Sequence, residues 1–350
     1  MILKIKHHYQ VKTWNNFSLT LKYDSIASGF GFDLFFDPND SEAREMFQVG
    51  HYHEASVEHD GELLMTGYIL NHKFVLSSKK NMSSISGYSK CGVLGDCNIP
   101  PSLYPLQSDG LSLAQITRKL IAPFRLKLVI DPAVSGKVNS VFEKTTASSG
   151  QTVAAYLSSL ASQKDIVLSH NKNGDLVFTE AKINSKPFYN FDGKGVATSI
   201  ELDFNGQGMH SHITLHKQAS IEGGNTGEQT LRNPFVPFVY RPLVKTQNSG
   251  GDNDTNDAAK NALKSEMKNI KLNITIPSWK LNDELITPNK IITVKSPELY
   301  LYEETKFFIE EVSFSGNEKQ QTTKIKCVLP EVYSGKTPEY FFNSQFNKGH

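Results

Sequence analysis

Three histidines are the side chains best spaced for metal chemistry. His210, His212 and His216 lie at even-numbered positions in a stretch of alternating apolar and polar residues. Side chains two apart on a strand share a face, so the three imidazoles, which are good zinc ligands, are expected on one face. Six residues is an unusually wide span for ligands on one strand, and a polar, solvated face is the simpler explanation of the pattern. We favour the solvated face, with metal binding as the alternative.

Other candidates for chemistry are weaker. His51, His53 and His59 lie on or beside one predicted strand and receive the same interpretation. Cys91 has no candidate base close in sequence, which favours a buried or idle thiol over a nucleophile. The short Gly206-Gln-Gly208 cannot cradle a phosphate, and no nucleophile elbow of the Gly-x-Ser-x-Gly type occurs.

Paired charges do not assemble a catalytic centre either. Asp252 and Asp254 fall in a polar loop, while Glu310 and Glu311 point to opposite faces of a predicted strand. The Lys79-Lys80 pair is too short a basic run to indicate nucleic-acid binding, and a solvated turn is the default. We therefore predict no catalytic, cofactor-binding or metal-binding residues, no cofactor, and a protein that is not an enzyme.

Composition narrows the class of protein further. At 350 residues the chain predicts two to four domains. Its 37 basic and 36 acidic side chains give a net charge of +1, which recommends neither nucleic acid nor an anionic membrane as the main partner. Three cysteines form no paired metal spacing and favour reduced thiols in a cytosolic product. The N-terminal apolar run is too short for a signal peptide, and no stretch approaches the roughly 20 apolar residues of a spanning helix.

The element that organises the chain is an internal repeat between Ser108 and Glu180. Each copy has a Ser or Thr suited to cap a helix, then apolar residues at helical spacing, then an alternating strand. The second strand turns at Gly174 into a hairpin. Positions forty residues apart correspond: Ser112 and Thr152, Leu113 and Val153, Ala114 and Ala154, Ile116 and Tyr156, Leu120 and Leu160, Leu126 and Ile166, Leu128 and Leu168.

Both flanks of the repeat have the period-two alternation of β-strands. Before it, short strands and an Asp60-Gly61 hairpin signal predict a small antiparallel barrel or sandwich. After it, strand patterns surround one clear helix at 258–269. The segment from Tyr340 to Phe346 has four aromatics and no core of its own, so it docks either back onto the chain or onto a partner.

The predicted fold class is mainly β with an α+β insertion of two helix–strand units. We divide the chain into a first β module at 1–97, completed by later strands, and the inserted domain at 98–190. A second β module at 191–330 contains the helix 258–269, and 331–350 is a tail.

The order of these landmarks resembles a known family, the tail or baseplate hub proteins of contractile-tailed bacteriophages. The Mu type is nearest, and phage late control protein D and the hub portion of type VI secretion spikes are related. The resemblance covers about 320 residues. The chain departs from the family in the loop 220–256 and after Thr287, where another Trp is expected and Pro288 stands instead. The resemblance is carried by Trp14 with Phe17–Leu21, Phe30–Leu34, Gly50, Leu63–Ile69, Ser86–Lys90, Leu94–Cys97, Leu113–Asp131, Gly150–Leu176, Ala258–Lys268, Ile276–Trp279, Pro288-Asn289, Phe308–Phe314 and Thr323–Pro330.

The resemblance implies two similar small β-barrels per subunit and a homotrimer with pseudo-sixfold symmetry. Such a ring would adapt the hexameric tail tube to the trimeric central spike, and its bore would form part of the DNA ejection channel. Implied partners are the spike, the tail tube or tube-initiator protein and the baseplate wedge proteins, with DNA only passing through and no stable membrane insertion. The protein is then expected in the virion baseplate, after assembly in the host cytoplasm. The inserted domain would lie on the outside of the ring.

Two alternatives remain. A tail-associated cell-wall hydrolase would need a clustered acid pair or a zinc site, which the sequence does not display. The hub of a type VI secretion-like spike would continue into a long repetitive needle, and no such repeat occurs before His350.

Overall fold

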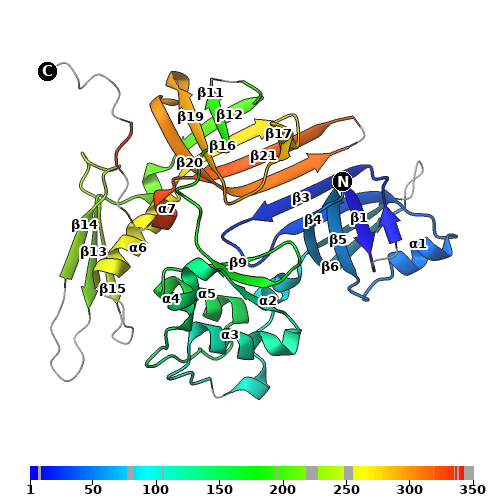
Figure 1. The fold of residues 1–350 in the computed structure, drawn as a ribbon, viewed down its shortest axis with the longest axis horizontal. Helices are drawn as coiled ribbons and strands as arrows, with labels where there is room; N and C mark the ends of the chain where they lie inside the picture. Colours follow the sequence, from blue (N-terminus) through cyan, green and yellow to red (C-terminus); the bar gives the residue numbers. More distant parts are fainter. Residues whose placement is uncertain are drawn as a thin grey trace. The chain divides into compact units, whose positions relative to one another are not determined.

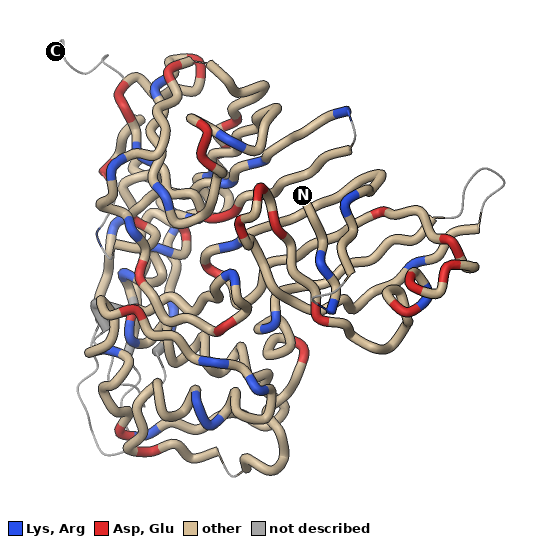
Figure 2. The backbone as a smooth tube through the Cα atoms, turned by 45° about the vertical axis from the view of Figure 1, so that its right-hand side comes forward, with Lys and Arg blue, Asp and Glu red and all other residues tan. Residues whose placement is uncertain are grey.

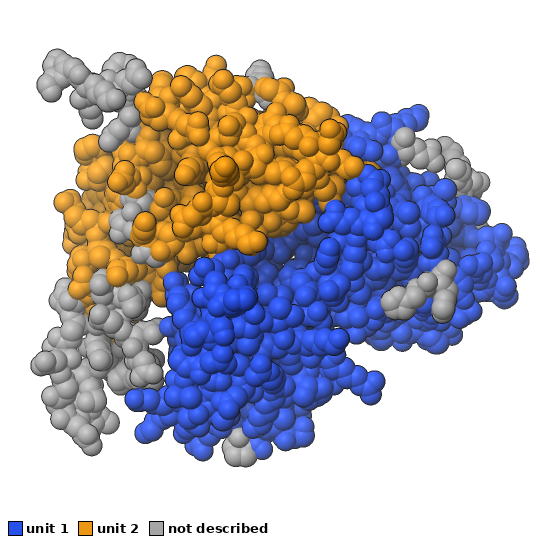
Figure 3. All heavy atoms as spheres, viewed as in Figure 1, with its two compact units in different colours: residues 1–180, 312–323 blue, residues 181–311, 324–350 orange. Residues whose placement is uncertain are grey.

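The computed structural model describes most of the chain, and its residues fall into two compact units (Figure 3). Unit 1 comprises residues 1–180 and 312–323, and unit 2 comprises 181–311 and 324–350. The predicted mainly β class is confirmed. The described residues are 1–6, 9–76, 82–104, 106–193, 195–217, 228–247, 255–317, 319–334, 336 and 339–342.

Unit 1 begins with an antiparallel sheet in the order β3-β4-β7-β6-β5-β1-β2 (Figure 1). Asp60 and Gly61 both have positive φ in the β5–β6 turn, as the Asp-Gly hairpin signal predicts. Helix α1 (Ser41–Met46) follows the turn at Asp37 and was not predicted. The strands are β1 (Ile2–Ile5), β2 (Tyr9–Val11), β3 (Asn16–Lys22), β4 (Gly29–Phe35), β5 (Glu54–His59), β6 (Glu62–Val75) and β7 (Met82–Ser89).

The predicted pair of helix–strand units follows in unit 1. Helix α3 leads to β8 and helix α5 leads to β9, and β10 lies between the two strands, parallel to β8 and antiparallel to β9. The elements are η1 (Lys90–Gly92), α2 (Val93–Asp96), η2 (Pro101–Leu103), α3 (Leu113–Ile121), η3 (Ala122–Phe124), β8 (Leu128–Ile130), η4 (Pro132–Val134), α4 (Ser135–Asn139), α5 (Val153–Gln163), β9 (Val167–His170) and β10 (Leu176–Thr179).

The forty-residue repeat is also present in the backbone conformation. Gly110 and Gly150 both have positive φ before their helices, and Arg125 and Asp165 both have positive φ where each helix turns into its strand. The apolar faces of α3 and α5 pack into one core together with residues of the strands. The inserted part therefore consists of two copies of one local conformation that share a single core.

Unit 2 contains a second sheet of β strands and a separate three-stranded sheet, β14-β13-β15, against which α6 packs (Figure 1). Helix α6 (Thr255–Met267) confirms the predicted C-terminal helix. The other elements are β11 (Tyr189–Asp192), β12 (Ser199–Phe204), η5 (Gly206–Gly208), β13 (His212–Lys217), β14 (Glu228–Arg232), β15 (Pro242–Gln247), β16 (Ile270–Ile276), β17 (Lys280–Leu281), β18 (Glu284–Leu285), β19 (Ile291–Ser296), η6 (Pro297–Leu299), β20 (Leu301–Gly316), β21 (Gln321–Val328) and α7 (Glu331–Ser334).

The two main sheets repeat one topology. The first has the order β3-β4-β7-β6-β5-β1 and the second has β12-β16-β21-β20-β19-β11, and equivalent strands also follow in the same order along the chain. The pairing of β5 with β1 is antiparallel, whereas the equivalent pairing of β19 with β11 is parallel. The C-terminal end of β20 and the N-terminal end of β21, which lie within residues 312–323, belong to unit 1. There β20 pairs with β3. The first sheet is therefore continuous with β20 through β3.

Charge is spread evenly over this framework. Lysine and arginine segments (blue) and aspartate and glutamate segments (red) are interspersed along a mostly tan backbone (Figure 2). Among the described helices, none combines the length and the apolar character that crossing a membrane requires.

Candidate functional site

The structure separates the three histidines that had suggested a metal site. His210 precedes β13, and its Nδ1 lies 2.7 Å from Oε1 of the buried Glu266 in α6. His212 begins β13, and its Nδ1 lies 2.8 Å from Oγ of Ser211. His216 is four residues further along the strand, about 13 Å from His212 at the usual rise. The three rings do not converge on one point.

The second histidine group also divides. His51 and His53 precede β5, with their ring centroids 5.4 Å apart, while His59 ends that strand and has Nε2 3.4 Å from Oδ2 of Asp60. His53 Nε2 lies 3.1 Å from the carbonyl oxygen of Glu45, and burial lowers the pKa of this imidazole. Within the described ranges, no three side chains of His, Cys, Asp or Glu form a group suited to a metal ion.

Two of the three thiols, those of Cys91 and Cys327, are buried in the fold. Cys91 is fully buried in η1 and donates a hydrogen bond from Sγ to the carbonyl oxygen of Gly174, 3.1 Å away. Burial raises the pKa of Cys91 to about 12, so the nucleophilic thiolate is disfavoured. Cys327 in β21 is also fully buried, and burial raises the pKa of its thiol.

The charged pairs have different surroundings from those of a catalytic acid pair. Glu310 lies 3.3 Å from Nζ of Lys268 and 3.6 Å from Nζ of Lys326, and it accepts a 2.9 Å hydrogen bond from the hydroxyl of Tyr333. This network joins β20, β21, α7 and the residue that directly follows α6.

The remaining sequence candidates add no site within the described part of the chain. Asp252, Asp254 and the Lys79-Lys80 pair lie outside the described residues. Gly206–Gly208 forms the short helix η5.

A histidine that the sequence analysis did not single out connects the inserted part to the first sheet. His170 ends β9, and its Nδ1 lies 2.8 Å from the carbonyl oxygen of Ser25 while its Nε2 lies 2.7 Å from Oγ of Ser28. Burial is the main cause that lowers the pKa of His170, so the neutral ring is favoured. No sequence pattern links His170 to a loop some 145 residues earlier.

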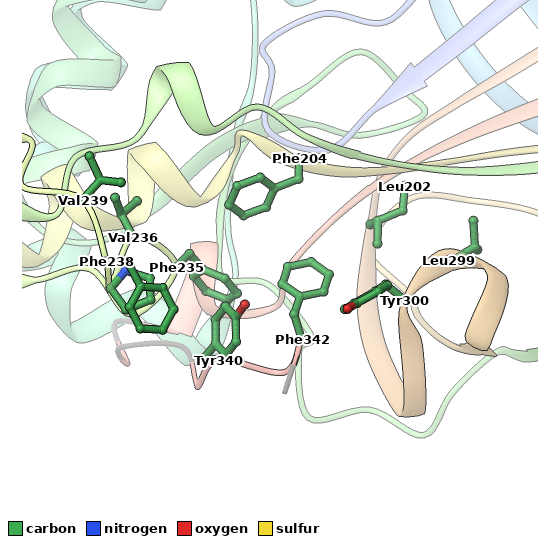
Figure 4. Close-up of a pocket in the computed structure, with 11 residues that line it drawn as sticks. Leu202, Phe204, Phe235, Val236, Phe238, Val239, Leu299, Tyr300, Tyr340 and Phe342 are labelled. Carbon is green, nitrogen blue, oxygen red and sulfur yellow. The ribbon is translucent and has the colours of Figure 1, made fainter. Parts of the chain in front are cut away.

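The described part of the aromatic tail docks back onto its own unit. Of the two alternatives, docking onto the chain or onto a partner, the first therefore holds for this part. Three consecutive rings, Tyr340, Phe341 and Phe342, lie near Phe235 with centroid separations of 5.6, 5.4 and 6.0 Å. Figure 4 shows Tyr340 and Phe342 beside Phe235. Phe235 is only 4% exposed as a result. Residue Phe346, which belongs to the same predicted segment, lies outside the described residues.

Beside the tail, unit 2 has an apolar hollow of about 500 Å³. Its lining contains no charged residue, and Phe238 on its rim is 95% exposed. Such an exposed apolar surface is typical of a protein-binding region. The Phe235–Tyr240 run of apolar residues was the available sequence signal. The lining residues are Leu202, Phe204, Phe235, Val236, Pro237, Phe238, Val239, Leu299, Tyr300, Tyr340 and Phe342 (Figure 4).

The inserted part matches a known family. Residues 91–180 fit the family described as baseplate hub protein gp44-like, second domain. The chain is also 21% identical over 320 residues to the baseplate hub protein gp44 of Escherichia phage Mu, and the match covers 87% of this chain and 81% of that protein. The resemblance to Mu-type baseplate hub proteins is therefore confirmed.

Two solved structures share the fold over nearly the whole chain. The 43 kDa tail protein of prophage MuSo2 from Shewanella oneidensis has 19% identity and a TM-score of 0.78, covering 95% of this chain and 98% of that one. The tail protein from Neisseria meningitidis MC58 has 19% identity and a TM-score of 0.79, with 96% and 98% covered. At this level of identity, the likeness establishes the arrangement of the elements.

Proposed function

We propose that this chain is the baseplate hub of a contractile phage tail, and that three copies form a ring. The ring adapts the hexameric tail tube to the trimeric central spike, and its bore is part of the DNA ejection channel. Support comes from the family match over 91–180 and from the Mu relative, whose name is that of a baseplate hub protein.

The observation that carries this proposal is the repeated strand order of the two main sheets. One chain with two equivalent β modules, repeated three times, presents six similar modules around one axis. Such a ring matches a sixfold partner through its modules and a threefold partner through its subunits. Closed symmetry of this kind also buries extensive surface without an open edge.

The proposal includes the partners and the place of action. The spike, the tail tube or tube-initiator protein and the baseplate wedge proteins bind the ring, and DNA passes through without a stable site. Assembly takes place in the host cytoplasm, and the mature protein is in the virion baseplate. The division into parts at 1–97, 98–190, 191–330 and 331–350 follows the two β modules, the inserted domain and the tail, and the fit of 91–180 to one domain family supports it.

The test is the mass of the purified full-length protein, alone and mixed with the spike protein encoded beside it. We expect a trimer, about 117 kDa from a 39.1 kDa chain (3 × 39.1), in at least one of the two samples. Electron micrographs should then show rings with three equivalent subunits. A protein that stays monomeric at high concentration in both samples contradicts the proposal.

We also propose that the role is not enzymatic. Support comes from the histidine and the thiol that the structure places in structural contacts, His210 with Glu266 and Cys91 with Gly174. Zymography on purified cell walls, with and without added zinc, tests this. Lysis by the pure protein would favour the hydrolase alternative.

A further inference from the structure

In unit 1, strand β3 is covered along its edge by the far end of β20, the first strand of the β20–β21 hairpin. Oγ1 of Thr20 is 2.9 Å from Oγ of Ser313 in β20. The apolar side chains on both strands are almost fully buried: Leu19 is 0% exposed and Phe314 is 1% exposed. A strand at the edge of a sheet needs such a cover, since its free backbone groups otherwise pair with other chains.

The equivalent strand in unit 2 is β12, which stands at the end of its sheet and pairs with β16. Its apolar residues face the same way as the fully buried residues of β16, because Leu202 pairs with Leu272 and Phe204 pairs with Ile270. Nevertheless Leu202 is only half-buried and Phe204 is 41% exposed. Both line the apolar hollow (Figure 4). Among the described residues, no strand pairs with the outer edge of β12, and Phe204 has a ring contact with the tail, where Phe342 lies 5.7 Å from it between ring centroids.

The hairpin equivalent to β20–β21 is β6–β7, and its far end is exposed. Tyr68 of β6 pairs with the first residue of β5, as Phe308 of β20 pairs with the first residue of β19. Six residues further along, each strand has a phenylalanine, Phe74 in β6 and Phe314 in β20. A bulge after Ile69 shifts the register of β6 by one residue. Phe74 and Phe314 are therefore equivalent by their distance along the strand, and not by their cross-strand partners. Phe74 is 45% exposed, whereas Phe314 is buried.

We propose that the β6–β7 hairpin of one copy lies along β12 of a second copy, as the β20–β21 hairpin lies along β3. Phe74 and the 89% exposed Leu76 then pack against Leu202 and Phe204 at the apolar hollow. Added strands of this kind bind through backbone hydrogen bonds, and the alternating side chains provide selectivity. The inference rests on the proposed ring and assigns the surfaces that join its subunits.

Charge and symmetry support a second copy of this chain as the partner that binds along β12. The outward residues of β12 include the exposed Glu201 and Asp203, and the exposed Lys73 lies beside Phe74 on the hairpin. The hairpin and the edge strand are different surfaces of one chain, so the contact is head-to-tail. Contacts of this kind close into a ring when the rotation fits, whereas a two-fold contact would stop at a dimer.

The first experiment compares the mass of two exposed apolar variants with that of the wild type. Phe74→Ser removes the central contact, and Val141→Ser is the matched control, since Val141 is 58% exposed in the inserted part. We expect the Phe74→Ser variant to dissociate at a concentration at least tenfold higher than the wild type, with unchanged circular dichroism, while the control behaves as the wild type. A Phe74→Ser protein that assembles as tightly as the wild type overturns the inference.

The second experiment traps the contact covalently. In a Cys97→Ser background, Lys73→Cys and Asp203→Cys are combined, and the oxidised full-length protein is run on a non-reducing gel. We expect bands up to a covalent trimer, and no trimer from either single variant. A covalent dimer as the end product, or only intramolecular closure, overturns the proposed contact.

The outcomes separate the two proposals. A wild type that is trimeric, with no effect of Phe74→Ser and no trimer band, contradicts this contact and leaves the ring in place. A folded wild type that is monomeric with and without the spike contradicts the ring itself.

Discussion

His170 shows how a single residue of the inserted part is bound to the first β module. Its two ring nitrogens lie within hydrogen-bonding distance of Ser25 and Ser28, so one nitrogen accepts and the other donates only when the ring is neutral. Burial lowers the pKa of His170 and, in the same direction, those of His53 and His72. A proton on His170 would oppose both the burial and the bond from Ser28.

This pKa direction predicts acid sensitivity. An unfolded imidazole has a pKa of about 6.5, above that of the folded His170, so the unfolded chain binds the proton first. The contribution of the neutral His170 ring to the free energy of unfolding is therefore complete above about pH 6.5, and it falls as the pH drops below that value. Chemical unfolding midpoints measured at several pH values should show a shallower decline for His170→Gln than for the wild type, with His53 and His72 causing the remainder. Parallel declines would contradict the role of His170.

Gly67 in β6 is required by a close approach of two backbones. A Cβ atom at this position would lie 1.9 Å from the carbonyl oxygen of Tyr88 in β7. We expect Gly67→Ala to lower the free energy of unfolding by about 1–3 kcal/mol, the usual cost of overpacking. The control is Gly136→Ala in α4, where nothing lies within 4 Å and alanine should stabilise by roughly 0.5–1 kcal/mol. Equal effects in urea unfolding would show that the close approach is absent.

At the scale of elements, the two helices of the repeat begin in the same way. Ser112 accepts a hydrogen bond from the backbone N–H of Gln115, whose side chain accepts one from the backbone N–H of Ser112. Thr152 accepts from the backbone N–H of Ala155 at the equivalent position. Each cap satisfies a donor that the helix itself leaves free, which explains why a Ser or Thr precedes both apolar runs.

Removal of a cap should loosen its own helix. We expect Ser112→Ala and Thr152→Ala each to cost about 1 kcal/mol. Amide hydrogen exchange of the full-length protein should become faster in α3 for the first variant and in α5 for the second. Ser158→Ala, at an exposed position inside α5, is the control and should leave both helices protected. Exchange that changed equally in both helices would show that the caps do not act locally.

At the scale of the whole molecule, net charge bears on how copies associate. With 37 basic and 36 acidic side chains, neither attraction nor repulsion between whole subunits is strong. The proposed contact has an apolar centre at Phe74, Leu202 and Phe204, and its charged residues lie outside that centre.

The proposed ring should therefore resist salt. Screening at 1 M NaCl reduces the range of charge interactions to about 3 Å, whereas burial of apolar surface remains favourable. We expect the trimer mass in sedimentation measurements to be the same at 0.1 and 1 M NaCl. Dissociation at high salt would mean that ion pairs such as one between Lys73 and Asp203 dominate the contact.

The sequence by itself determined the features that repeat locally. Helix caps at Ser112 and Thr152, period-two alternation and the Asp60-Gly61 turn depend on neighbours a few residues away, so they can be read from the order of residues. The forty-residue offset and the ordered landmarks also sufficed to indicate the family, which the match over 91–180 bears out.

Only the tertiary structure decided which strands lie beside one another. The pairing of β20 with β3, the contact of His170 with Ser25 and the aromatic cluster around Phe235 join residues more than 100 positions apart. Alternation along a strand marks its buried face but not its neighbour, because any strand with a similar face can pair there. For the same reason, the exposure of Phe204 in one sheet and the burial of Leu19 in the other became visible only in three dimensions.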